Sequence, residues 1–320
     1  MEAPEIRIPH SLSWDPCPET ERSFVRFRNP DMGQTWIARE EGDPPVVVSV
    51  VIPTSDADRQ GYFPKLLDQV HSQIFRNFEL IIIKGDSRQG RAINTGAALA
   101  RGKYMIILDD DTSLPDSGTF GKLVAVMDAH PEIGMAGGNN VLPADCPPFI
   151  KRVMEEIPRR AWDPVRKITE SDLAEHPCLI MRVDDFKSVG GENELIPRGL
   201  DPYLRQAFRD FGMRVVLVPD IVYHHLPPGS WNKLLRQFYR NGRNAAYVNR
   251  HYPQWMIETP RAHGPFKPRR SLLFRIIRFQ LTLLGALFAR KFVLFLSEAA
   301  YASGFLHEYM SGKQSPGARS

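Results

Sequence analysis

Three apolar runs, separated by two stretches of helical spacing, dominate the first half of the chain. The runs cover Val46–Ile52, Phe78–Ile83 and Tyr104–Leu108, and such continuous apolar segments are typical of strands buried on both faces of a parallel sheet. Between them, residues 62–75 place apolar side chains three and four positions apart, which predicts a helix, and a second helix is expected over residues 90–100, closed by Arg101-Gly102. The alternation of strand and helix predicts right-handed crossovers and a parallel sheet flanked by helices.

The second half continues the alternation less regularly. Residues 143–175 give no clear pattern, whereas Asp201 directly before Pro202 fits a helix N-cap followed by a proline in the first turn. The predicted elements are, in order, a helix over 118–130, strands over 133–138 and 178–182, a helix from about 201 to 212, strands over 215–218 and 222–225, and a basic helix over 231–248.

The two ends of the chain differ from the middle. Residues 1–45 are rich in proline and charge with scattered aromatic side chains, which predicts an irregular N-terminal arm packed on a main domain over 46–260. Residues 261–320 form a C-terminal segment of amphipathic helices, because Arg and Lys interrupt its apolar stretches before they reach the ~20 residues that span a bilayer. Such helices can lie in the membrane interface, or pack on the enzyme or on a second subunit.

Composition narrows the class of protein without naming it. The 320 residues are 42% hydrophobic and 24% charged, which is ordinary for a globular protein with a sizeable core. A net charge of +4 is too mild to argue for nucleic acid as a partner. The three cysteines form neither a metal-spaced pair nor a disulfide framework, and the N-terminus lacks the pattern of a secretory signal. We therefore expect a cytoplasmic protein.

The candidate chemistry lies where the third apolar run ends. Asp109, Asp110 and Asp111 follow the buried strand directly, and three adjacent carboxylates repel one another unless a cation neutralises them. Hard oxygen ligands suit Mg²⁺ or Mn²⁺. Loops after parallel strands meet at one edge of the sheet, so residues 54–56 and 84–87 are expected beside the triplet. The alternative interpretation is a charged turn between a strand and a helix.

A series of short motifs, in register from about residue 46 to 250, resembles the family 2 glycosyltransferases, which have the GT-A fold. Each motif is weak by itself, and the resemblance depends on their order and spacing. The motifs are Val48–Thr54, Gln73 with Phe78–Ile82, Gly90–Gly96 with Ala100–Tyr104, Leu108–Asp111, Val189–Gly191, Leu200–Arg205 with Gly212, and Val222–His225 with Arg236–Arg243.

The resemblance implies roles for the acidic residues. Asp109 and Asp111 correspond to the family's DxD motif, whose second carboxylate binds the Mn²⁺ or Mg²⁺ that bridges the donor diphosphate. Asp201 takes the place of the general base that deprotonates the acceptor hydroxyl. If Asp201 only caps its helix, the base would be Asp184 or Glu192.

Other positions of the motifs are implied in donor binding. His224 or His225 falls where some members place a further metal ligand, and the sequence leaves the choice between them open. Arg240 and Arg243 match basic residues near the diphosphate or the acceptor, although they could equally be solvated charges on a helix. The remaining residues expected to bind the nucleotide sugar are Pro53, Thr54 and Asp56 at the nucleoside, together with Asp86, Arg91, Asp109 and Asp110.

The chain departs from the family pattern at three points. The loop that normally reads Asp-Asp-Gly-Ser is Lys84-Gly-Asp-Ser here, so either Asp86 substitutes from a shifted position or the base is recognised differently, and the nucleobase of the donor stays open. Leu200 replaces the Glu that precedes the catalytic Asp, and Asn241 replaces the Trp of processive polymer synthases. Processive synthesis is therefore not expected.

The resulting hypothesis is a metal-dependent, inverting glycosyltransferase. It would move a sugar from a UDP- or GDP-sugar to a hydroxyl of a glycan or lipid-linked acceptor, at the inner face of the plasma membrane as a peripheral protein. The first alternative is a nucleotidyltransferase acting on sugar phosphates, but residues 53–57 lack the Gly-rich, basic loop that such enzymes favour. The second is a binding module without catalysis, against which the retained Asp109, Asp111 and Asp201 argue.

Overall fold

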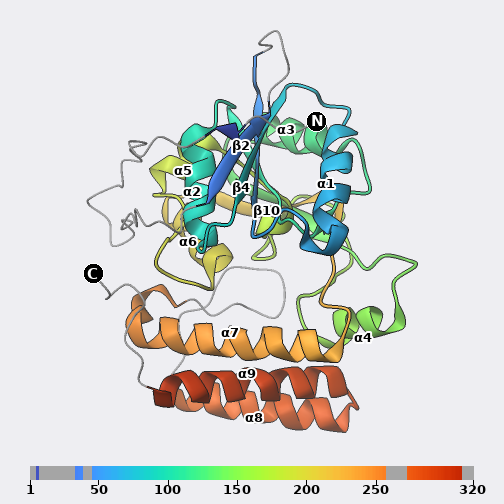
Figure 1. The fold of residues 1–320 in the computed structure, drawn as a ribbon, viewed down its shortest axis with the longest axis vertical. Helices are drawn as coiled ribbons and strands as arrows, with labels where there is room; N and C mark the ends of the chain where they lie inside the picture. The colour runs from blue at the N-terminus through green and yellow to red at the C-terminus, as the bar shows by residue number, and fades with distance from the viewer. Residues whose placement is uncertain (1–4, 7–32, 39–44, 257–271, 312–320) are drawn as a thin grey trace.

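The protein is a layered α/β structure with a helical layer at one end (Figure 1). The computed structural model describes residues 5–6, 33–38, 45–256 and 272–311. Its ten strands are β1 (Glu5–Ile6), β2 (Gln34–Ala38), β3 (Val48–Thr54), β4 (Phe78–Lys84), β5 (Tyr104–Ile107), β6 (Thr112–Ser113), β7 (Ile133–Asn140), β8 (Thr169–Glu170), β9 (Leu179–Arg182) and β10 (Arg214–His225).

The helices follow the predicted alternation. In chain order the α-helices are α1 (Tyr62–His71), α2 (Gln89–Leu99), α3 (Thr119–Ala129), α4 (Pro148–Glu156), α5 (Val183–Ser188), α6 (Leu200–Asp210), α7 (Trp231–His251), α8 (Leu272–Phe288) and α9 (Phe292–Ser311). Short 3₁₀ turns are η1 (Arg59–Gly61), η2 (His176–Cys178) and η3 (Pro253–Trp255).

The centre of the sheet is mostly parallel, as the apolar runs predict. Its strand order is β1-β2-β4-β3-β5-β9-β7-β10-β6, with β8 paired to β10. Among the six central strands, β4, β3, β5, β7 and β10 run in one direction, and β9 runs against its neighbours β5 and β7. Val50, Val51 and Ile52 on β3 are fully buried because helices cover both faces of this strand.

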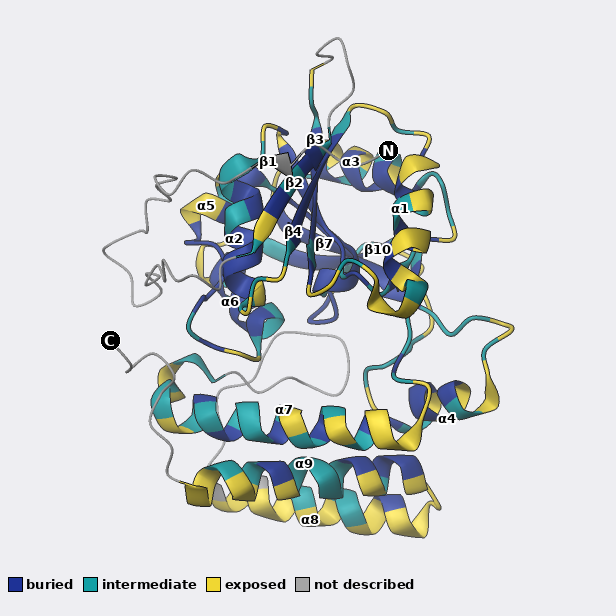
Figure 2. Cartoon of the chain, viewed as in Figure 1, coloured by how far each residue is buried: buried dark blue, intermediate teal, exposed yellow. Residues whose placement is uncertain are grey.

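Two hydrophobic clusters hold the layers together, one on each face of the sheet. One joins the sheet to α2, α5 and α6, and the other joins it to α1 and α3 (Figure 2). The fold leaves the carboxyl ends of β3, β4 and β5 at one common edge, where the polar loops follow.

Three local predictions need correction. The arm over 1–45 is not wholly irregular, because β2 extends the sheet by pairing antiparallel with β4. Residues 214–225 form one strand with an irregular register rather than two strands. The helix cap is Gly199, whose φ of 86° lies in the left-handed region that glycine tolerates. Asp201 therefore lies inside the first turn of α6 and does not cap it.

The C-terminal helices form a layer beside α7. In Figure 1, α9 lies between α7 and α8, and both pairs are in contact. Gly242 on α7 and Gly304 on α9 permit the closest approach, because a Cβ at either position would fall on a backbone carbonyl of the other helix. Val293 on α9 is fully buried in the same interface region, with Leu234 of α7. None of the helices within the described ranges is long and apolar enough to cross a membrane.

Candidate active site

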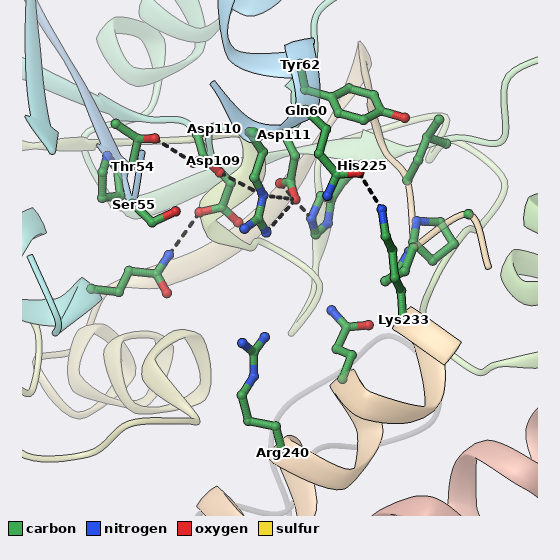
Figure 3. A pocket seen from close by; sticks show the side chains of 18 of the residues that line it. Thr54, Ser55, Gln60, Tyr62, Asp109, Asp110, Asp111, His225, Lys233 and Arg240 are labelled. Carbon is green, nitrogen blue, oxygen red and sulfur yellow. Dashed lines mark hydrogen bonds and ion pairs between the residues drawn. The ribbon is translucent and has the colours of Figure 1, made fainter. Parts of the chain in front are cut away.

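A cleft of about 1050 Å³ opens at the carboxyl edge of the sheet. One wall carries the acidic turn after β5, and the facing wall is the first half of α7 (Figure 3). Of the residues predicted to bind the donor, those on this lining are Pro53, Thr54, Asp86, Asp109, Asp110, Asp111, His225 and Arg240. The predicted convergence of the loops after β3, β4 and β5 is present in the structure.

The three aspartates of the acidic turn have different partners. Oδ1 of Asp109 accepts a hydrogen bond from Gln89 on α2 at 3.0 Å. Asp110 is 7% exposed, and its Oδ2 accepts from the hydroxyl of Thr54 at 2.7 Å. Asp111 contacts His225, whose Nε2 lies 3.1 Å from Oδ1. Two of the carboxylates are thereby directed to β10 and α2 rather than to solvent.

The end of β10 brings a histidine to the turn. His225 pairs with Thr112 in the short antiparallel ladder between β10 and β6, and this register places it next to Asp111. Within the described residues, Asp109, Asp111 and His225 form a group whose ligand atoms lie within 4.8 Å of one another. Two carboxylates and one imidazole suit a divalent cation such as Mn²⁺, so these residues fit the metal that the sequence implies.

Burial and neighbouring charges shift the pKa values of Asp109, Asp111 and His225 differently. Burial raises the pKa of Asp109 to about 7, although the charges of His225 and His176 oppose it. Burial would also raise the pKa of Asp111, but the hydrogen bond and charge of His225, with the charge of Arg59, hold it well below its usual range. For His225, burial lowers the pKa, and the contacts with Asp111 outweigh that effect and raise it. Asp109 is thus the carboxylate that its neighbours stabilise least, and a bound cation would stabilise its charged form.

Arg59 supplies the protein's own positive charge at this turn. Its Nε and Nη2 donate to Oδ2 of Asp111 at 3.1 and 2.9 Å, and its Nε lies 3.3 Å from Asp110. The loop that presents it is held by the carboxylate of Asp56, which accepts from the backbone of Asp58 and Arg59. Arg59 has a φ of 47°, in the left-handed region that costs a non-glycine residue energy.

The facing wall is basic. Lys233, Arg236 and Arg240 follow one another at spacings of three and four residues on α7, which places them on one side of the helix, and all three line the cleft. Figure 3 shows Lys233 reaching Gln60, to which its Nζ donates at 2.7 Å across the mouth of the cleft. A negatively charged ligand between the two walls would meet this positive charge on one side.

Asp201 lies beside the cleft rather than on its lining. Its side chain is 29% exposed. Oδ1 accepts a hydrogen bond from the backbone N–H of His176 at 2.8 Å, and Nδ1 of the same histidine lies 3.3 Å away. Burial would raise the pKa of Asp201, but the charges of His176 and Arg205 outweigh it and lower the pKa. Asp201 is thus held as a carboxylate, the form that a base requires.

Asp86 borders the cleft, but its carboxylate is committed to the protein. The side chain is only 1% exposed and forms an ion pair with Arg91 at 2.8 Å. Oδ1 also accepts from the backbone of Arg88, and Oδ2 from the backbone of Gly33 at 3.3 Å. The structure places Asp86 and Arg91 as a buried pair that holds the loop after β4.

The remaining predicted residues point elsewhere. Nδ1 of His224 donates to the carbonyl of Val141 at 2.6 Å, and His224 is not part of the metal-capable group. Arg243 is bound to Glu308 on α9 at 2.6 Å and does not line the cleft. Asp184, a fallback for the base, is exposed in the first turn of α5, and Glu192 is completely buried.

The structure places at the site three residues that no sequence motif indicated. Arg59 and Gln89 lie in segments without a motif of their own, and Arg160 lies in the stretch over 143–175 that had no readable pattern. The periodicity that marks helices and strands carries no information about which loop residues meet. For Arg59, the one indication in the sequence was its position as a basic residue shortly after the first predicted strand.

Comparison with known proteins agrees with the geometry. The family model described as glycosyl transferase family 2 matches residues 84–187, which include the acidic turn. No curated protein matches the sequence at a significant level. Among solved structures, the chain is similar to the mannosyltransferase PcManGT from Pyrobaculum calidifontis in complex with GDP-Man and Mn²⁺, at 14% identity and a TM-score of 0.52, over 85% of this chain and 92% of that chain.

Two further solved structures are similar at a lower level. The chain resembles S. aureus TarS 1-349 at 12% identity and a TM-score of 0.41, over 84% of this chain and 92% of that chain. It resembles the same protein in complex with UDP-GlcNAc at 12% identity and a TM-score of 0.42, over 83% and 91% of the two chains. The family match and the fold shared with PcManGT confirm the resemblance stated from the sequence.

Proposed function

We propose that this chain, a family 2 glycosyltransferase with the GT-A fold, transfers a sugar from a nucleotide-sugar donor to an acceptor hydroxyl with inversion at the anomeric carbon. The observation that carries the proposal is the group of Asp109, Asp111 and His225 in the cleft, of which both aspartates lie inside the segment that matches the family. A diphosphate needs a counter-charge when it leaves, and this group can hold one.

In the proposed complex, the donor diphosphate lies between the acidic turn and α7. Asp109, Asp111 and His225 would hold a divalent cation, for which Mn²⁺ or Mg²⁺ is suitable, and His225 rather than His224 completes the group. When bound, the cation supplies the counter-charge for the leaving nucleoside diphosphate. Arg240 on α7 supports the diphosphate from the opposite wall, and Pro53 and Thr54 border the nucleoside end of the cleft.

The proposed reaction uses Asp201 as the general base. Its carboxylate takes the proton of the acceptor hydroxyl, whose oxygen forms a bond to the anomeric carbon while the bond from that carbon to the diphosphate breaks. The electron pair leaves with the nucleoside diphosphate. Since Asp86 is engaged by Arg91, we infer that the nucleobase of a UDP- or GDP-sugar is read by other groups of the loops after β3 and β4.

We also propose that the chain works at a membrane surface, on a glycan or a lipid-linked acceptor, at the inner face of the plasma membrane. The outer side of α8 is exposed (Figure 2), its large exposed residues are apolar, and Arg290 and Lys291 follow its C-terminal end. Exposed apolar patches of this kind mark contact surfaces, and cations beside them are attracted by anionic lipids. The apolar residues that carry this proposal are Phe292 at the start of α9 and, on α8, Leu273, Phe274, Ile276, Ile277, Leu281, Leu284, Leu287 and Phe288.

The decisive experiment is a screen of UDP- and GDP-sugars for Mn²⁺-dependent release of nucleoside diphosphate. The wild-type chain is expected to use one or a few donors, and Asp111→Asn to lose about 10²-fold or more of the rate. Asp116→Asn is the matched control, because Asp116 pairs with Lys122 on the surface away from the cleft. Release that persists unchanged in a chelator would contradict the metal-dependent reaction.

The same assay separates the alternatives. A nucleotidyltransferase would instead form pyrophosphate from a nucleoside triphosphate and a sugar phosphate. A binding module would bind a nucleotide without releasing any product.

A further inference from the structure

A buried histidine lies behind Asp201, and the proposed reaction leaves it without a role. The side chain of His176 is 3% exposed. Its Nε2 donates to Oε1 of Glu192 at 2.6 Å, and Nδ1 lies 3.3 Å from Oδ1 of Asp201. Both ring nitrogens therefore face a carboxylate, and the backbone N–H of His176 donates to the same Asp201 oxygen at 2.8 Å.

This geometry favours the charged form of the ring. A neutral imidazole carries one N–H donor and one acceptor nitrogen, and the acceptor would face a carboxylate oxygen. The doubly protonated ring donates on both sides. Burial lowers the pKa of His176, but the charges of Asp201 and Glu192, with that of Asp109, raise it to about 10. Arg205 on α6 is the nearby cation that acts on Asp201 as well.

The second carboxylate is rigidly placed. Glu192 is completely buried, in the loop that follows α5. Its backbone N–H donates to Asn94 on α2 at 2.8 Å, and Asn94 donates back to its carbonyl at 2.9 Å. Because α2 packs on the central sheet, this reciprocal pair ties Glu192 to the core. A carboxylate buried in this way cannot reach an acceptor, so Glu192 is not a candidate for the base.

We propose that His176 is a positioning residue for Asp201: anchored by Glu192, it fixes one carboxylate oxygen and keeps the group ionised, while the exposed part of Asp201 faces the acceptor. The inference rests on the proposed function, in which Asp201 is the base. The role differs from structural support, since it predicts an effect on proton transfer and not on donor binding. The three side chains come from η2, the loop after α5, and α6.

The first test needs no substrate. In the full-length wild-type chain labelled with ¹⁵N-histidine, NMR is expected to show His176, among the nine histidines, with both ring nitrogens protonated at about pH 8.5, where an ordinary imidazole is neutral. That signal should be absent from His176→Gln. A neutral His176 at this pH in the wild-type protein would overturn the proposal, whatever the variants do.

The second test separates turnover from binding. His176→Gln is expected to lower kcat by about 10²-fold while the donor KM stays within about two-fold. The acid limb of the pH–rate profile should move to higher pH, because loss of a neighbouring cation raises the pKa of a carboxylate. Glu192→Gln, which keeps the shape of the side chain, should shift the profile in the same direction by less.

A matched control and the opposing outcomes complete the design. His130→Gln removes a histidine that is paired with Glu132 at 3.2 Å but is exposed at the end of α3, and it should leave the profile unchanged. If His176→Gln folds and its profile superimposes on the wild type, the positioning role is wrong although the transferase function stands. If His176→Gln does not fold, the positioning role is tested by the pH–rate profile of Glu192→Gln and by the protonation of His176 in the wild-type NMR spectrum. A wild-type chain without transfer activity would instead refute the proposed function.

Discussion

The buried pair of Asp86 and Arg91 makes the sharpest prediction about how this site is built. Replacing Arg91 by Met keeps an unbranched apolar stem but removes the guanidinium and its charge. Asp86, 1% exposed, would keep its backbone donors and lose the guanidinium, whose Nε and Nη2 both lie within 3.1 Å of its oxygens. Breaking a buried ion pair from one side costs about 3–5 kcal/mol, because a buried charge is left uncompensated.

The assay is unfolding by urea or heat, measured for single and double variants. For a domain of this size the loss corresponds to a fall in Tm of roughly 6–20 °C. Arg214→Met is the control, since Arg214 also forms ion pairs, with Glu132 and Glu170, but is 39% exposed, where such pairs contribute up to about 1 kcal/mol. Asp86→Asn combined with Arg91→Met should restore part of the stability, because it removes the unpaired charge.

The result also decides what Asp86 does. If Asp86 has only a structural role, Asp86→Asn should weaken the binding of UDP-sugars and of GDP-sugars to the same extent. The argument from burial is refuted if Arg91→Met loses less than about 1 kcal/mol while Asp86→Asn changes the preference between the two nucleobases. In that case Asp86 would turn toward the donor, as the sequence motif implied.

Three further outcomes are expected. Arg59→Ala should bind Mn²⁺ more tightly in calorimetry, by about 10-fold, because Arg59 neutralises Asp111; equal affinity would show that the two do not compete. Leu281→Glu should weaken sedimentation with anionic vesicles, whereas Ile74→Glu, at an apolar residue of comparable exposure away from α8, should not; equal losses would argue against a specific surface. Because the pKa of His176 is raised, its stabilising effect is complete below about pH 6.5 and is lost as the pH rises through about 10, so the stability gap between wild type and His176→Gln should shrink over that window; a constant gap in denaturant unfolding would contradict this.

Sequence patterns predicted the central fold because buried positions recur along the sequence with the period of the strand or helix that contains them. Strand β3 and helix α1 follow directly from continuous and three-to-four spacing of apolar residues. The carboxyl-edge rule then located the acidic turn, because parallel strands end at one side. Residues 34–38 were not predicted as a strand, since a segment of five residues carries too few alternating positions to recognise.

The details of the site depended on contacts that no local pattern encodes. The choice between His224 and His225 depends on the pairing of β10 with β6, which puts alternate residues on opposite sides of the strand. His176 contacts Asp201 across 25 positions, through a turn in a stretch of mixed composition. The pairing of Arg243 with Glu308 could not be foreseen without knowing that α9 covers α7.

The close contact of α7 and α9 at two glycines fixes the distance between α8 and the cleft. With no side chain between the backbones at Gly242 and Gly304, the two helices cannot slide apart without losing the contact. Packed helices lie roughly 8–10 Å apart, so the axis of α8 lies roughly 16–20 Å below the basic wall of the cleft. At a bilayer this stack would act as a fixed spacer, and an acceptor group would have to stand about that far above the lipid to be glycosylated. A fragment cut at residue 260 would retain α7 but lose this spacer.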